Sequence, residues 1–93
     1  MADIERDQTV GGDGAFASWS VAIDDAVIYA YAVDGRERYG AHWDDGFPFD
    51  VEVMVMPNDA TGETIYEHPF PMAFTTSEKA DAAARAVLAR YLP

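Results

Sequence analysis

The sequence has no cysteine and few basic residues, and both absences narrow what the protein can do. Without cysteine, disulfide bonds and thiolate chemistry are excluded. Only 6 lysines and arginines stand against 17 aspartates and glutamates, so the 93 residues carry a formal net charge of −11. Proteins hold nucleic-acid phosphates and anionic lipids with basic surfaces. The composition therefore excludes direct nucleic-acid binding and disfavours attachment to a membrane surface.

Long hydrophobic runs are absent as well. No stretch reaches the roughly 18 apolar residues of a membrane-spanning helix. The first residues have neither the basic nor the apolar region of a secretion signal, so we expect a cytoplasmic protein. Hydrophobic residues still make up 49% of the chain, which favours a folded core over disorder. Because residues 1–14 are polar and end in a glycine-rich stretch, we predict a flexible acidic N-terminal tail over 1–14 and one domain over 15–93.

Alternating apolar residues predict an antiparallel sheet at the start of the domain. Residues 16–23 alternate with a period of two, and residues 26–33 form a second β-prone run rich in valine, isoleucine and tyrosine. Asp24–Asp25 between them suits a tight turn. Asp34–Gly35 then provides a strong hairpin signal, because a type I′ turn needs two residues that tolerate positive φ. We therefore predict a third strand over 36–43. It would add Tyr39, Ala41 and Trp43 to an apolar face formed by Trp19, Val21, Ile23, Ile28 and Ala30.

The second half of the chain predicts two more strands and a helix. Residues 51–56 alternate valines with Glu52 and two methionines, and residues 63–68 form a further β-prone run. From Ala80 to Tyr91, apolar residues recur at helical spacing, with Thr75, Thr76 or Ser77 as the N-cap. The predicted fold is α+β: an antiparallel sheet of four or five strands with one C-terminal amphipathic helix packed on one face.

Acidic residues are concentrated in the middle of the chain. Residues 39–78 contain eight acidic and no basic side chains. Carboxylates on outward strand positions would form rows that imitate a phosphate backbone and dock on a basic protein surface. A solvated face that serves only solubility, or adaptation to high salt, explains the same block. The candidate partner-binding residues, all acidic, are Asp44, Asp45, Asp50, Glu52, Asp59, Glu63 and Glu67.

A second candidate surface lies on the sheet face opposite the helix. Tyr29 and Tyr31 would lie there beside Arg36 and Arg38. Tyrosine and arginine dominate binding hot spots, so this set would serve as an interface of a homodimer or accessory domain. Cross-strand stacking of tyrosine on arginine, without any partner, is the structural alternative.

Neither a metal site nor a catalytic motif is evident. The acidic pairs at strand ends fit turn formation, and no EF-hand spacing follows Asp44–Asp45. His42 and His68, the only histidines, lack a second histidine or cysteine at ligand spacing. Gly11–Gly14 lacks the lysine of a phosphate-binding loop. We expect no cofactor and no enzymatic activity. A pocket in the folded protein that holds a histidine beside a carboxylate would reopen the question of enzymatic activity.

The entry to the predicted helix resembles a motif of small sheet-plus-helix domains. Phe74, Thr76 and Ala80 fit the pattern Phe-x-Thr-x-x-x-Ala, which is found in short uncharacterised bacterial and phage proteins. The short, cysteine-free, acidic chain is also similar in composition to phage-encoded inhibitors of the anti-CRISPR type. That resemblance implies a protein partner from a nucleic-acid-handling complex, which the acidic surface would engage in place of nucleic acid.

Overall fold

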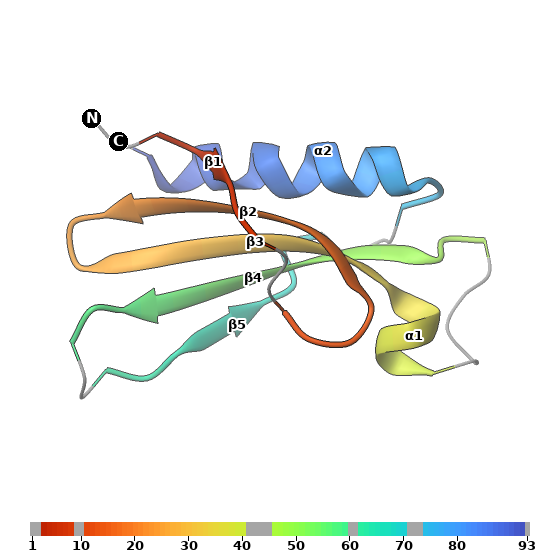
Figure 1. Cartoon of the computed structure of the whole chain (residues 1–93), viewed down its shortest axis with the longest axis horizontal. Helices are drawn as coiled ribbons and strands as arrows, with labels where there is room; N and C mark the ends of the chain where they lie inside the picture. The colour runs from red at the N-terminus through yellow and green to blue at the C-terminus, as the bar shows by residue number, and fades with distance from the viewer. Residues whose placement is uncertain (1–2, 9–10, 41–45, 60–61, 71–73, 93) are drawn as a thin grey trace.

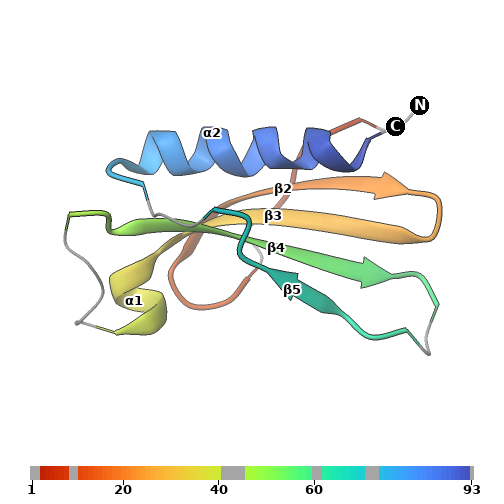
Figure 2. The ribbon, with the colours of Figure 1, turned by 180° about the vertical axis from the view of Figure 1, so that it is seen from behind.

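The computed structural model has an α+β architecture and describes residues 3–8, 11–40, 46–59, 62–70 and 74–92. Five antiparallel strands form one sheet in the order β1-β2-β3-β4-β5, and helix α2 covers one face of it (Figures 1 and 2). The predicted fold class is confirmed. In chain order the elements are β1 (Glu5–Arg6), β2 (Ala15–Ile23), β3 (Ala26–Asp34), α1 (Gly35–Tyr39), β4 (Phe49–Pro57), β5 (Ile65–Glu67), α2 (Ser77–Leu88) and a final 3₁₀ turn (Ala89–Tyr91).

The first hairpin has the predicted register. Ile23 pairs with Ala26 across the Asp24–Asp25 turn, and Val21 pairs with Ile28. Side chains alternate between the faces of the sheet, so Val21 and Ile28 share the face under α2, where both are buried. A shift by one residue would turn these apolar side chains to the opposite face, which is why the hydrophobic pattern alone determines this pairing.

The predicted third strand over 36–43 is wrong over its described part. Asp34 is in an extended conformation, its side chain accepts a hydrogen bond from the Arg36 amide, and helix α1 follows at once. Aspartate is as well suited to an N-cap as to a turn, and neither Asp34 nor Gly35 has the positive φ of a type I′ turn. Ala41 and Trp43, predicted for the apolar face, lie outside the described residues, and Tyr39 belongs to α1.

Strand β4 takes the place of that strand beside β3. Ala30 pairs with Val53 and Ala32 pairs with Val51, so the valines of β4 supply the third row of the apolar face. The remaining expectations for this half of the chain are confirmed in outline, since β4 includes the predicted range 51–56 and β5 lies within the predicted range 63–68.

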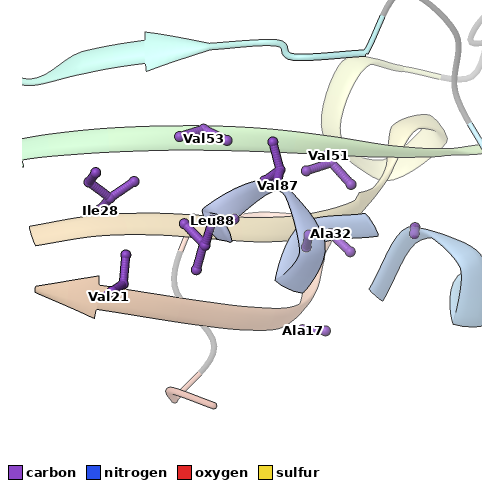
Figure 3. Close-up of a cluster of buried hydrophobic side chains, with 11 residues drawn as sticks. Ala17, Val21, Ile28, Ala32, Val51, Val53, Val87 and Leu88 are labelled. Carbon is purple, nitrogen blue, oxygen red and sulfur yellow. The ribbon is translucent and has the colours of Figure 1, made fainter. Parts of the chain in front are cut away.

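Helix α2 packs its small residues against the sheet. Thr76 is the N-cap, and its side chain accepts a hydrogen bond from the Lys79 amide. The side chains of Ala80 and Ala84 are buried at the interface, and Val87 and Leu88 extend from the helix over β2, β3 and β4 (Figure 3). The alanines on both sides of this interface bring the helix close to the strands, which leaves little room for larger side chains.

The N-terminal segment differs from the predicted tail. Glu5 and Arg6 pair with Ser20 and Trp19 as edge strand β1. The Arg6 guanidinium lies 3.0 Å from the Asp81 carboxylate of α2, and the Trp19 indole donates a 2.7 Å hydrogen bond to the same carboxylate. The chain before β2 then curves beneath the sheet, on the side away from α2, where α1 also lies (Figures 1 and 2). We call this side of the sheet the second face.

Overfilling the helix–sheet interface is expected to destabilise the protein. Ala84→Leu adds volume where no space is open, so the free energy of unfolding should fall by about 1–3 kcal/mol. Ala82→Leu makes the same change at an exposed position of the same helix and should leave stability nearly unchanged. Urea denaturation of both variants measures the difference, and equal midpoints would contradict the close packing described here.

Candidate functional site

The second face of the sheet divides into a covered half and an open half. Ser18, Tyr31 and Glu52 pair across β2, β3 and β4, so they form one row of neighbouring side chains on this face. All three side chains are buried, although they point away from the hydrophobic core. The burial comes from segments that lie over this row, and the groups involved form a polar cluster. Its members are Tyr31, Arg38, Tyr39, Asp50, Glu52 and His68.

The Glu52 carboxylate is the centre of the polar cluster. Its Oε2 atom accepts a 2.7 Å charge-assisted hydrogen bond from Arg38, and its Oε1 atom accepts one from the Tyr39 hydroxyl. The His68 Nε2 atom lies 3.6 Å from Oε1, a contact that becomes an ion pair when the histidine is protonated. Only 8% of the Glu52 side chain is exposed, so these partners replace the water that the carboxylate loses.

Asp50 lies beside Glu52 on β4 and is buried to a similar degree. Its Oδ1 atom accepts a 2.8 Å hydrogen bond from the Val51 amide. Its Oδ2 atom lies 3.5 Å from the Tyr39 hydroxyl and 3.4 Å from His68 Nδ1. Tyr39 and His68 therefore link the two carboxylates to each other.

A strap formed by residues 11–14 covers Tyr31. Arg38 donates hydrogen bonds to the backbone carbonyls of Gly11 and Asp13, and the Asp34 amide donates to the Gly14 carbonyl at 2.9 Å. Gly11 lies directly on the Tyr31 ring at φ +105°, and a Cβ atom there would be 2.5 Å from the ring. Glycine is required at this position by both the backbone conformation and the close approach.

Two tyrosine hydroxyls in the polar cluster are held in their protonated form. Burial, followed by the nearby Glu52 charge, raises the pKa of Tyr31 to about 12. Burial and the hydrogen bond to Glu52 likewise raise the pKa of Tyr39 well above its ordinary value. The Tyr31 hydroxyl makes no hydrogen bond of normal geometry within the described part of the chain, although it lies next to Glu52.

This geometry corrects the prediction for Asp50 and Glu52. Both were predicted to lie outward as solvent-exposed phosphate surrogates, but both side chains are buried and their oxygens accept hydrogen bonds from within the chain, including those from Arg38 and Tyr39 of α1. The strand alternation is correct, since both side chains point away from the core. The error concerns what lies over the second face.

The other described members of the predicted acidic set do not share one surface. Asp59 and Glu63 are exposed in the connection between β4 and β5. Glu67 is exposed on the side of the sheet that faces α2, where it accepts a 2.7 Å hydrogen bond from the Tyr91 hydroxyl. Asp44 and Asp45, like His42, lie outside the described residues.

The alternative interface is also corrected. Tyr31 is fully buried under the strap, and Arg38 is occupied by Glu52 and the strap carbonyls. Arg36 lies on α1, 3.4 Å from the Asp34 carboxylate, and is exposed. Tyr29 lies in the next row of the same face, in the open half, and is only partly buried. The four residues therefore do not form the single surface that the sequence predicted.

The open half of the second face carries a group of apolar and aromatic side chains, of which sequence reasoning had assigned only Tyr29 to a site. Tyr29 pairs with Met54, Met54 pairs with Tyr66, and Met56 pairs with Val27. Met56 is 40% exposed and Tyr66 is 62% exposed. We call Tyr29, Met54, Met56 and Tyr66 the aromatic–methionine patch. The available signal was the alternation of methionine with valine in β4, which places large apolar groups on both faces of one strand.

Acidic turns border the aromatic–methionine patch at one end of the sheet. The Asn58 amide donates a 2.8 Å hydrogen bond to the Asp25 carbonyl, which joins the β2–β3 turn to the β4–β5 connection. These two segments carry four exposed acidic residues, which we call the acidic end: Asp24, Asp25, Asp59 and Glu63.

Comparisons with family models, curated proteins and solved structures find no match for this chain. Over the described ranges, histidine, aspartate and glutamate form no group of three arranged to hold a metal ion. Neither α1 nor α2, the helices of the described chain, has the length and apolar character needed to cross a membrane.

Because the strap rests on the Tyr31 ring, substitutions of two neighbouring glycines should lower the stability of the protein by different amounts. Gly11→Ala and Gly12→Ala both place a side chain at positive φ, but only the first drives a Cβ atom into the tyrosine ring. At Gly12 the nearest atom is the end of the Arg38 side chain, at 3.1 Å, which is able to move. We expect Gly11→Ala to lose about 1–3 kcal/mol more stability than Gly12→Ala in urea denaturation. Equal losses would mean that the strap does not rest on the ring.

Removal of Arg38 should leave an uncompensated charge inside the polar cluster. Arg38→Met is expected to lower the free energy of unfolding by about 3 kcal/mol, because Glu52 stays buried without its cation. Arg36→Met, on the same helix, breaks only a more exposed pair and should cost less than about 1 kcal/mol. Adding Glu52→Gln to Arg38→Met should restore part of the loss in a double-mutant cycle. A purely additive cycle would contradict the coupling between these residues.

Proposed function

We propose that this protein is a non-enzymatic binding protein that docks on a basic protein surface, of the kind with which nucleic-acid-handling proteins hold phosphates. The observation that carries the proposal is the distribution of charge over the fold. Each of the five arginines already contacts an acidic or aromatic side chain of the same chain. Most acidic residues of the described chain are exposed, so its surface carries an excess of negative charge.

The acidic end is the part of the surface that supports this function best. Asp24 and Asp25 lie in one turn, Asp59 and Glu63 lie in the next connection, and the Asn58–Asp25 hydrogen bond holds the two segments together. Carboxylates concentrated in this way attract a cationic partner over a distance and accelerate its association, with a strong dependence on salt. The proposal therefore keeps Asp59 and Glu63 from the predicted set and replaces Asp50 and Glu52 with Asp24 and Asp25.

The resemblance in composition to phage-encoded inhibitors extends the proposal to a biological role. Such a protein would occupy the groove of a defence complex that otherwise holds nucleic acid. The small size, the acidic surface and the absence of cysteine fit this role, and competition with nucleic acid for the partner would be its direct consequence.

An acid–base enzyme is the competing function, because His68 does lie beside two carboxylates. A general base needs an oxygen or nitrogen that is free to take a proton from substrate. Here Glu52 accepts from Arg38 and Tyr39, and Asp50 accepts from the Val51 amide. The cluster supports a structural role, in which its hydrogen bonds hold α1 and the strap on the sheet.

Charge reversal at two matched places tests the proposed function. We expect Asp24→Lys, Asp25→Lys, Asp59→Lys and Glu63→Lys together to weaken binding of a fluorescent oligolysine peptide by about tenfold at low salt. The control reverses four exposed acidic residues near the N-terminus, Asp3, Glu5, Asp7 and Asp13, and changes the net charge equally. Fluorescence anisotropy measures both, and circular dichroism checks folding. Equal losses in the two variants would assign the acidity to solubility and overturn the proposal.

A further inference from the structure

We propose that the aromatic–methionine patch is a docking surface for a basic protein segment that inserts an apolar side chain between lysines or arginines. This inference rests on the proposed function and names the chemistry of the partner. The acidic end would attract the segment, and the patch would hold it.

The first support is the contrast between the two halves of the second face. At the end nearer α1, Tyr31 and Val33 are fully buried under segments that lie over them. One residue pair further along the same strands, Tyr29 and Met54 are only partly buried, and beyond Met54 the edge residue Tyr66 is 62% exposed. The strands are continuous through both halves, so the open half is a direct extension of the covered one, with apolar instead of charged side chains on β4 and without a cover.

The second support is the chemistry of the side chains. Tyrosine is enriched at the centres of protein interfaces, since it buries a large ring and keeps a hydroxyl available for hydrogen bonding. Methionine is unbranched and adapts its shape to an inserted group. Tyr66, Met54 and Tyr29 lie in one row across three strands, and Met56 adjoins that row. A contiguous exposed patch of this kind on a small protein marks an interaction site.

Charge complementarity indicates which kind of partner fits the aromatic–methionine patch. The acidic end borders the patch on one side, so an incoming segment meets exposed carboxylates there in addition to the apolar side chains. A second copy of the chain would bring a net charge of −11 and its own acidic end against the first, and the two would repel each other. Anionic lipid would be repelled for the same reason. A segment with lysine or arginine on either side of an apolar anchor satisfies both the patch and its border.

Two synthetic peptides of equal charge and length test the inference. Both carry lysines at each end, and their central pair is either Leu-Trp or Gly-Ser. We expect the Leu-Trp peptide to bind about tenfold more tightly, a gain that corresponds to about 1.4 kcal/mol. In a nuclear magnetic resonance titration, the methyl signals of Met54 and Met56 should shift with the Leu-Trp peptide and not with the Gly-Ser peptide.

Matched variants on β4 and β5 locate the effect. Tyr66→Ser and Met56→Ser should each remove most of the advantage of the Leu-Trp peptide and leave Gly-Ser binding unchanged. Ile65→Ser is the control, because Ile65 is 52% exposed on the neighbouring position of β5 and faces the other side of the sheet. Ile65→Ser should keep the full advantage.

The outcomes separate this inference from the proposed function. If both peptides bind equally and Tyr66→Ser has no effect, the docking surface is overturned while binding to basic surfaces stands. If the patch variants lose the advantage but the charge reversal at the acidic end changes nothing, the docking surface stands and the proposed function fails. If sedimentation shows a dimer that Tyr66→Ser dissociates, the occupant is a second copy and the inference is overturned.

Discussion

The buried carboxylate of Glu52 is the group on which the second face of the sheet depends. A charge with so little exposure requires cationic and hydrogen-bonding partners at close range, and Arg38 and Tyr39 provide them from one short helix. These two hydrogen bonds attach α1 to β4. The second donor nitrogen of Arg38 then holds the carbonyls of Gly11 and Asp13, so the same arginine positions the strap over Tyr31.

The consequence is a sheet with three different environments. The face under α2 is a hydrophobic core of alanine, valine and leucine. One half of the second face is an internal polar cluster, in which acidic residues serve the fold. The other half presents tyrosine and methionine at the surface, next to exposed acidic turns. The docking surface proposed above is the half that no other segment of the described chain covers.

Sequence patterns predicted the elements whose stability is local. The β2–β3 hairpin follows from alternation and a two-residue turn, and α2 follows from helical spacing with a threonine cap. At Asp34–Gly35 the same reasoning was wrong, because an aspartate before glycine is equally suited to cap a helix and to form a turn. The choice between a helix and a hairpin depends on which strand pairs with β3. That strand is β4, which begins ten residues after the last residue of α1.

The sequence by itself determined the α+β class, the faces of the strands and the excess of acid over base. Each of these follows from composition or from a period of two or 3.6 residues. Only the tertiary structure decided which carboxylates are buried and which apolar side chains are exposed. Asp50 and Met54 occupy equivalent positions of β4 on the same face, yet Tyr39 of α1 contacts the first, which is buried, while the second is only partly buried. The cover comes from segments distant in sequence, and no local pattern records where they pack.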